Sequence, residues 1–320
     1  MAKKNSQEYW RERAKEVIDE ESKNDYEIIK EVERIINEMN DDIEKEVLKF
    51  YAKYATAEGI SLKDAKKKID TFDVQSFKDK AKQYVKEKDF SDKANKELKQ
   101  YNTAMYVSRE KFLQMQLGLI VTYAYARLES QMYNYMESAY YRSLEQQAGI
   151  LGESLQVSLS DVKAIIFTPF HNSKWSTRHW EDMKLVRKHV QRTASHVLLR
   201  GRHPNEFVKD MRKDTGNSTY EIKRLLLTET ARVQTMATKQ HMLDNHGEDT
   251  EYEYVAKMDS KTTPTCRSLN GKTFKVKDMM PGVNAPPMHP FCRSAVVPHT
   301  GDWRTEFFAK RKGKYNLDNL

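Results

Sequence analysis

The chain has only two cysteines among its 320 residues, Cys266 and Cys292, which excludes a disulfide-rich secreted scaffold. No segment approaches the twenty or so uncharged apolar residues that a membrane-spanning helix needs, so we expect no membrane association. The N-terminus runs from Met1 into charged residues without an apolar core. We therefore expect no signal peptide, and synthesis in a reducing cytoplasm.

Sequence signatures of common enzyme classes are also missing. The chain has no phosphate-binding loop, no dinucleotide-binding fingerprint and no zinc-protease helix motif. No nucleophile, base and acid occur at a spacing that indicates a catalytic set. We therefore assign no catalytic residue, and we expect a protein that is not an enzyme.

The charge is distributed unevenly along the chain. Charged residues make up 32% of the sequence and the mean hydropathy is -0.84, yet 38% of the residues are hydrophobic. This balance is typical of long solvated helices around a modest core. Residues 1–50 carry a net charge of −5. Because the whole chain carries +8, the remaining residues carry a net charge of +13. The basic part either binds a polyanion or has lysines scattered over solvated helix faces.

The N-terminal half is predicted to be helical. Apolar residues recur every three or four positions over residues 26–51, which indicates an amphipathic helix. A second stripe predicts a helix of roughly 70 Å from about Ser91 or Tyr101 to Gln147. Its stripe consists of Leu113, Leu117, Ile120, Ala124, Leu128, Met132, Tyr135 and Ala139. The many tyrosines of this helix pack either against a partner or against the chain's own helices.

A second group of helices follows residue 160. One is expected to begin near Trp175 and to end at Gly201, and Pro204 suits the first turn of the next. Ser218-Thr219-Tyr220-Glu221 has the form of a capping box, which predicts a further helix that reaches Asn245.

Glu229 falls on the apolar stripe of this last predicted helix. A carboxylate on such a face has to be paired, neutral or part of a site. We expect Arg178 as its partner, with Arg293 second. Alternatively, Glu229 extends to the edge of a domain.

The pattern changes after Gly247. Residues 252–258, 273–276 and 295–297 are short strand candidates, joined by proline-rich loops. Asn270-Gly271 predicts a hairpin turn. The fold class is therefore mainly α, with a long helical N-terminal arm or bundle followed by a helical plus small α+β, loop-rich C-terminal domain. The small unit is too poor in apolar residues to fold without the preceding helices, and a cross-link would help it.

Cys266, His289 and Cys292 supply three ligand types that zinc prefers. A tetrahedral site would take Asp259, His299 or a water as the fourth ligand. The alternatives are a Cys266–Cys292 disulfide, which would contribute roughly 3 kcal/mol through chain entropy, or two buried reduced thiols. The only cofactor that we consider is therefore zinc.

The C-terminal motifs resemble those of the phage Mu F-like minor head proteins, also called head morphogenesis or minor capsid proteins. That signature has an Asp, a C-x-x-C, then Leu-Asp-Gly-Lys, and after a spacer Pro-Pro-x-His-Pro-x-Cys-Arg-Cys. The matching residues are Asp259, Cys266, Leu269, Gly271, Lys272, Pro286, Pro287, His289, Pro290, Cys292 and Arg293. Thr228 and Glu229 match the Arg-Thr-Glu helix of the family, with Leu227 in place of its arginine, and Trp175 and Arg178 match a segment further upstream.

Two positions depart from this signature together. Thr263 stands where the first cysteine of the C-x-x-C is found, and Ser294 stands where the last cysteine is found. If the missing pair were a disulfide in the family, Cys266 and Cys292 would be the other pair. If the missing residues were metal ligands, zinc binding by this chain would be weaker.

The resemblance implies a virion component of a tailed phage that lies inside the capsid near the portal. It implies association with the portal protein, non-specific binding to packaged DNA, and roles in head morphogenesis and DNA delivery. We assign residues 1–150 to partner docking, 151–305 to the head morphogenesis domain and 306–320 to a basic tail. The alternative is a metal-dependent enzyme that acts on nucleic acid or nucleotide and is packaged in the virion; a third interpretation is a host helical scaffold.

Overall fold

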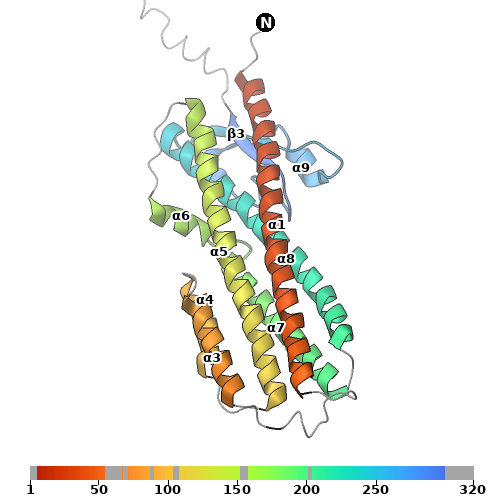
Figure 1. Ribbon diagram of the computed structural model, residues 1–320. Helices are drawn as coiled ribbons and strands as arrows, with labels where there is room; N and C mark the ends of the chain where they lie inside the picture. The colour runs from red at the N-terminus through yellow and green to blue at the C-terminus, as the bar shows by residue number, and fades with distance from the viewer. Residues whose placement is uncertain are drawn as a thin grey trace, which may run out of the picture. The chain divides into compact units, whose positions relative to one another are not determined.

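The computed structural model describes residues 6–54, 67, 71–86, 90–103, 108–151, 158–200 and 204–299. It is 77% helical, with a small three-stranded antiparallel sheet near the C-terminus, which confirms the expected fold class (Figure 1). The predicted basic tail, residues 306–320, lies outside the described residues. No described helix is apolar over a length that could cross a membrane.

The chain forms two compact units. The helical unit comprises Tyr26–Glu137 and Leu159–Leu226, and the mixed unit comprises Met1–Asp25, Ser138–Ser158 and Leu227–Leu320. The helices α1 (Ser6–Tyr54), α5 (Arg109–Leu151) and α8 (Pro204–His246) contribute residues to both units. The limits at residues 150 and 305 stay a prediction.

The core of the helical unit is built from the predicted stripes. In α1 the residues Val32, Ile36, Met39, Ile43 and Val47 are buried. In α5 the buried residues include Leu113, Leu117, Ile120, Ala124, Leu128 and Met132, and Tyr125 donates a hydrogen bond to Asp182 of α7 (Trp175–Arg200). Ion pairs such as Arg212–Asp41 and Lys223–Glu33 connect α8 to α1. Tyrosines of α5 thus pack against the chain's own helices.

The prediction of one continuous helix from Ser91 or Tyr101 to Gln147 was wrong at its N-terminal end. The Ser91 hydroxyl accepts a hydrogen bond from the Ala94 amide and begins a short helix, α4 (Asp92–Lys99). A 3₁₀ turn, η1 (Gln100–Thr103), follows, and α5 begins only at Arg109. The short helices α3 (Thr71–Lys86) and α6 (Leu159–Ile166) belong to the same unit.

The predicted capping box at Ser218 was also wrong, because α8 is continuous from Pro204 to His246. The hydroxyls of this stretch form bonds inside the helix instead: Thr219 Oγ1 donates to the Thr215 carbonyl and Thr215 Oγ1 donates to the Arg212 carbonyl. Pro204 opens the helix as predicted. Gly247, with a φ of 86°, follows its end, as expected.

The sheet of the mixed unit has the strand order β2-β1-β3 and is antiparallel throughout. The strands β1 (Glu251–Val255), β2 (Thr273–Lys275) and β3 (Ala295–His299) overlap the three strand candidates, although β1 ends three residues before the predicted limit and β3 continues two residues beyond it. Asn270-Gly271 forms a turn in which the Lys272 amide donates to the Leu269 carbonyl, and Gly271 has a φ of 80°. The turn joins α9 (Pro264–Leu269) to β2 rather than two strands, so the hairpin prediction was wrong.

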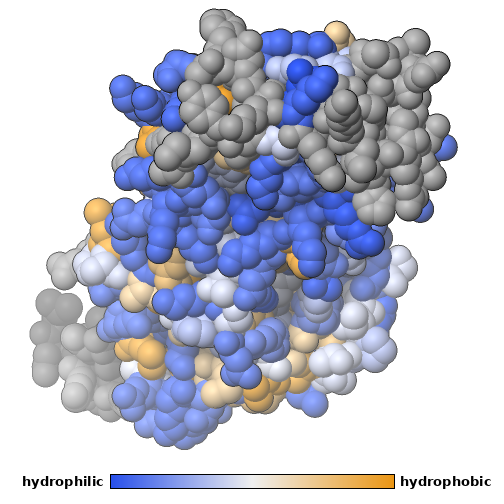
Figure 2. Space-filling model, turned by 90° about the horizontal axis from the view of Figure 1, so that it is seen from below, coloured by the Kyte–Doolittle hydropathy of each residue, from blue (hydrophilic) through white to orange (hydrophobic). Residues whose placement is uncertain are grey.

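The face drawn in Figure 2 is mostly hydrophilic, with hydrophobic residues in separate patches. Exposed large apolar residues include Leu159, Leu185 and Val283.

Candidate metal centre

Two short segments of the mixed unit hold the candidate ligands. Cys266 lies in the first turn of α9, where Pro264 occupies the N-terminal position and the Thr263 hydroxyl accepts a hydrogen bond from the Cys266 amide. His289 and Cys292 lie in the loop before β3, in a turn closed by a hydrogen bond from the Cys292 amide to the His289 carbonyl. The two segments are therefore fixed by local backbone bonds.

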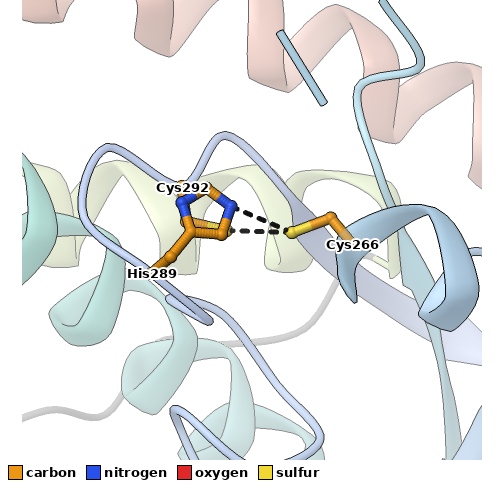
Figure 3. A group of neighbouring side chains, drawn as sticks. All are labelled: Cys266, His289 and Cys292. Atoms are coloured by element: carbon orange, nitrogen blue, oxygen red, sulfur yellow. Dashed lines mark hydrogen bonds between the residues drawn. The ribbon is translucent and has the colours of Figure 1, made fainter. Parts of the chain in front are cut away.

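The ligand atoms of Cys266, His289 and Cys292 all lie within 4.8 Å of one another (Figure 3). Cys266 Sγ is 3.2 Å from His289 Nε2 and 3.8 Å from Cys292 Sγ. Both cysteines are free and buried. Because Zn–S bonds are about 2.3 Å long, the S···S edge of a zinc tetrahedron is about 3.8 Å, so the two sulfurs already have the separation that a shared metal ion requires.

Further groups surround the sulfur of Cys266. The buried Tyr254 hydroxyl donates a hydrogen bond to Cys266 Sγ at 3.3 Å. The Cys292 thiol lowers the pKa of Cys266 to about 4, and hydrogen bonds from Thr263, Tyr254 and Ser294 act in the same direction. The pKa of Cys292 is raised, first by its hydrogen bond to Cys266 and then by burial. The surroundings therefore favour the thiolate form of Cys266 over that of Cys292.

The second nitrogen of His289 is also held. His289 Nδ1 is 2.8 Å from the carbonyl oxygen of Pro290, which can only accept. Nδ1 therefore carries a proton and Nε2 is directed toward Cys266 Sγ. Histidines that ligate metals are oriented by a bond of this kind from their second nitrogen.

Asp259 lies outside the three-residue group. Both of its carboxylate oxygens accept hydrogen bonds from Arg293 at 2.7 Å, and this arginine lowers the pKa of Asp259 well below its usual range. His299, the other protein ligand considered, is 3.9 Å from Glu253. Asp259 is thus held by Arg293, and neither Asp259 nor His299 belongs to the group of three ligands.

A small cavity of about 20 Å³ lies beside Cys266 and His289. Its lining includes Thr263 and Ser294, together with the cationic residues Lys257, Lys261 and Arg293. A cavity of this volume holds about one water molecule.

Glu229 is fully buried in α8, as the stripe predicted, and Arg232 is a partner that the sequence analysis did not consider. Arg232 Nε donates to Glu229 Oε2 at 2.7 Å, and both side chains are at most 3% exposed. Arg293 forms its ion pair with Asp259 instead. The expected pair of Glu229 with Arg178 stays a prediction.

The remaining residues of the motif are buried or hydrogen-bonded within the fold. Trp175 is buried at the start of α7, with its ring stacked on Phe167. Thr228 Oγ1 accepts a hydrogen bond from the Phe291 amide, so α8 holds the loop that bears Cys292. Pro287 is buried. The backbone carbonyl of Lys272 accepts a hydrogen bond from the Tyr254 amide of β1.

The sequence analysis missed Tyr254 and Glu253. Glu253 is 1% exposed and accepts hydrogen bonds from Gln7 and Arg11 of α1. The only sequence signal for Tyr254 was its place in a strand candidate, where alternate residues share one face.

Comparison with known proteins gives one match. Residues 188–297 match the family model described as Phage Mu protein F like protein, and the segment includes α8, β1, β2, most of β3 and all three candidate ligands. No curated protein and no solved structure shows a significant match.

Proposed function

We propose that this chain is a phage head morphogenesis protein, and more specifically a minor head protein inside the capsid, because residues 188–297 match the family model of phage Mu protein F like proteins. It associates with the portal, binds packaged DNA without sequence preference and aids head morphogenesis and DNA delivery. The observation that carries the DNA part of this proposal is a group of exposed cations on α4 and α7.

This group, the α4–α7 basic face, consists of Lys93, Lys96, Lys184, Lys188 and Arg192, all exposed. The α7 members recur every four residues, so they lie on one side of that helix. Contacts between the helices bring the two sets together: Arg187 forms an ion pair with Glu97, and the Lys93 ammonium lies 5.9 Å from the Trp180 ring centre. Glu181 is exposed on the same side of α7.

No ion pair involves any of these five cations among the described residues. The exposed lysines of α1 differ, because Lys30 and Lys45 have carboxylate neighbours one turn away. A row of unpaired cations along a helix is suited to phosphate groups spaced along a nucleic-acid backbone. It carries no base-reading geometry, so we propose backbone contacts only.

The test is binding of random-sequence duplex DNA, followed by fluorescence anisotropy as salt is increased. Up to five phosphate contacts predict a slope of about −4 to −5 in a plot of log K against log salt. The double variant Lys184→Glu/Lys188→Glu should bind far more weakly and with a shallower slope. The double variant Lys30→Glu/Lys45→Glu has the same net charge and should bind almost as the parent does. Equal losses in both variants would reject the basic face.

Portal association is proposed from the family alone, and a binding experiment tests it separately. The full chain should co-purify with assembled portal protein of its own phage and be present in purified virions. Failure of both the portal pull-down and the DNA titration would overturn the proposal.

The alternative of a metal-dependent enzyme acting on nucleic acid or nucleotide has less support. Such an enzyme needs a substrate beside the metal. The cavity beside Cys266 and His289 has about 20 Å³, room for a water-sized ligand rather than for a nucleotide. We therefore place the portal- and DNA-associated role ahead of this alternative.

A further inference from the structure

We propose that Cys266, His289 and Cys292 bind one Zn²⁺ ion, and that the fourth coordination position is taken by water or a small anion rather than by a protein side chain. This inference goes beyond the proposed function, because it concerns the mixed unit and does not depend on DNA or the portal.

The separation of the donor atoms is the first argument. The S···S distance of 3.8 Å equals the expected edge of a zinc tetrahedron. The S···N distance of 3.2 Å is slightly shorter than the edge of about 3.5 Å expected from Zn–S and Zn–N bond lengths. An ion could therefore enter with a small adjustment of the His289 ring, which is only partly buried.

The second argument concerns orientation. Nδ1 of His289 donates to the Pro290 carbonyl, so Nε2 is the ring nitrogen directed toward Cys266 Sγ, 3.2 Å away. Three donor atoms of the types that Zn²⁺ accepts, two sulfurs and one imidazole nitrogen, therefore converge on one point.

The surroundings of the donors fit an ion that is held in place. The Tyr254 hydroxyl donates to Cys266 Sγ and Pro290 orients His289, the two kinds of bond that fix ligands around metal ions. Cys266 comes from α9, whereas His289 and Cys292 come from the loop before β3. These two residues follow Cys266 by 23 and 26 positions in the chain. A shared ion would cross-link the two segments where the small sheet has few apolar residues.

The fourth position is assigned from the cavity. Asp259 is bound by Arg293, so its carboxylate is not directed to the group of ligands. The cavity beside Cys266 and His289 is instead lined by the hydroxyl residues Thr263 and Ser294 and by cationic side chains. Neutral hydroxyls are poor zinc ligands compared with thiolates, and nearby cations favour an anion such as chloride or hydroxide.

The first experiment measures metal in the full chain, purified under reducing conditions. We expect one zinc per chain by elemental analysis, with zinc lost in Cys292→Ser and in His289→Gln. The control Ser268→Ala, on the exposed side of α9, should keep the zinc. Absence of zinc from the parent protein, with no uptake on addition of Zn²⁺, would overturn the site.

The second experiment tests whether the fourth coordination position is open. It is made first on the parent protein, so its result does not depend on how well a variant folds. The zinc is exchanged for Co²⁺, and the visible absorption bands are recorded while azide or thiocyanate is added. We expect tetrahedral bands with thiolate charge transfer, shifted by either anion. In Ser294→Cys, a third thiolate should strengthen the charge-transfer band and abolish the response to anions. A parent spectrum that is insensitive to both anions would show that a protein ligand fills the position.

The two proposals fail independently. The α4–α7 basic face lies in the helical unit, so a chain without zinc would still be expected to bind DNA. Loss of DNA binding in the lysine variants would leave the zinc content unchanged.

Discussion

Arg293 donates one hydrogen bond to each carboxylate oxygen of Asp259, both at 2.7 Å, across 34 residues of chain. The pair connects the loop before α9 to the residue that follows Cys292, so it sets the distance between the two segments that carry the candidate ligands. Arg267 adds hydrogen bonds from its guanidinium to the carbonyls of Asp259 and Thr262.

The first prediction concerns this pair. Arg293→Lys should weaken zinc binding by about tenfold, because a single ammonium cannot reproduce the two parallel bonds that orient the loop. Competition with a chromophoric chelator measures the affinity. Lys272→Gln, at an exposed side chain of the same unit, is the control and should bind zinc as the parent does. An unchanged affinity in Arg293→Lys would mean that the ligands are positioned without the pair.

The second prediction concerns Glu229 and Arg232. Both side chains are almost fully buried, so Arg232→Met removes a buried charge that is hydrogen-bonded to the Glu229 carboxylate. Arg232→Met should therefore lower the free energy of unfolding by about 3–5 kcal/mol. Urea denaturation measures this loss. Arg224 is a half-exposed arginine about two turns earlier in α8, in an i,i+3 pair with Glu221. Arg224→Met should lower the free energy of unfolding by less than about 1 kcal/mol. Equal costs would contradict a special role for burial.

The sequence predicted the elements whose apolar residues repeat regularly. The buried stripes of α1 and α5 lie where periodicity placed them, and the three short strands overlap the segments that residue type and flanking loops indicated. The prediction from sequence was wrong where a local helix-start signal, a serine in the N-cap position, competed with packing. Ser91 and Ser218 both looked like helix starts, yet only Ser91 is an N-cap, because the hydroxyls around Ser218 are satisfied within a continuous helix.

The candidate site was predictable in its ligands but not in their surroundings. The types and spacing of Cys266, His289 and Cys292 pointed to one group, which the structure brings together. The partners of Asp259 and the hydroxyl of Tyr254 depend on contacts between distant segments, which no spacing rule contains. The Glu229 partner Arg232 was three residues away in the same helix, a spacing that the i,i+3 rule could have identified.

The third prediction compares two helical glycines. A Cβ at Gly118 of α5 would lie 2.7 Å from Gln191 Nε2 and 2.8 Å from the Tyr101 hydroxyl, whereas Gly216 of α8 has no atom within 4 Å of that position. Gly216→Ala should stabilise the protein by about 1 kcal/mol, because alanine favours the helix. Gly118→Val should destabilise it by about 1–3 kcal/mol through overpacking against α7 and η1. Chemical denaturation of both variants tests the contrast, and a stabilising Gly118→Val would contradict this close approach.

The fourth prediction is a pH dependence that arises from His179. This histidine is 1% exposed, and its Nε2 lies 2.8 Å from the Tyr125 carbonyl of α5. Burial lowers the pKa of His179 to about 4 in the folded protein. The unfolded chain, with a pKa near 6.5, takes up the proton first, so stability is complete above about pH 6.5 and falls between there and pH 4.

The expected loss between pH 7.5 and pH 5 from this single group is about 2 kcal/mol. Urea denaturation in the presence of a chelator, which removes any contribution from a metal at His289, measures it. His179→Gln keeps a donor to the Tyr125 carbonyl but does not titrate, so its stability should fall by about 2 kcal/mol less over the same range. His246→Gln, at the exposed end of α8, should follow the parent. If His179→Gln showed the full pH dependence of the parent, the buried imidazole would not be its source.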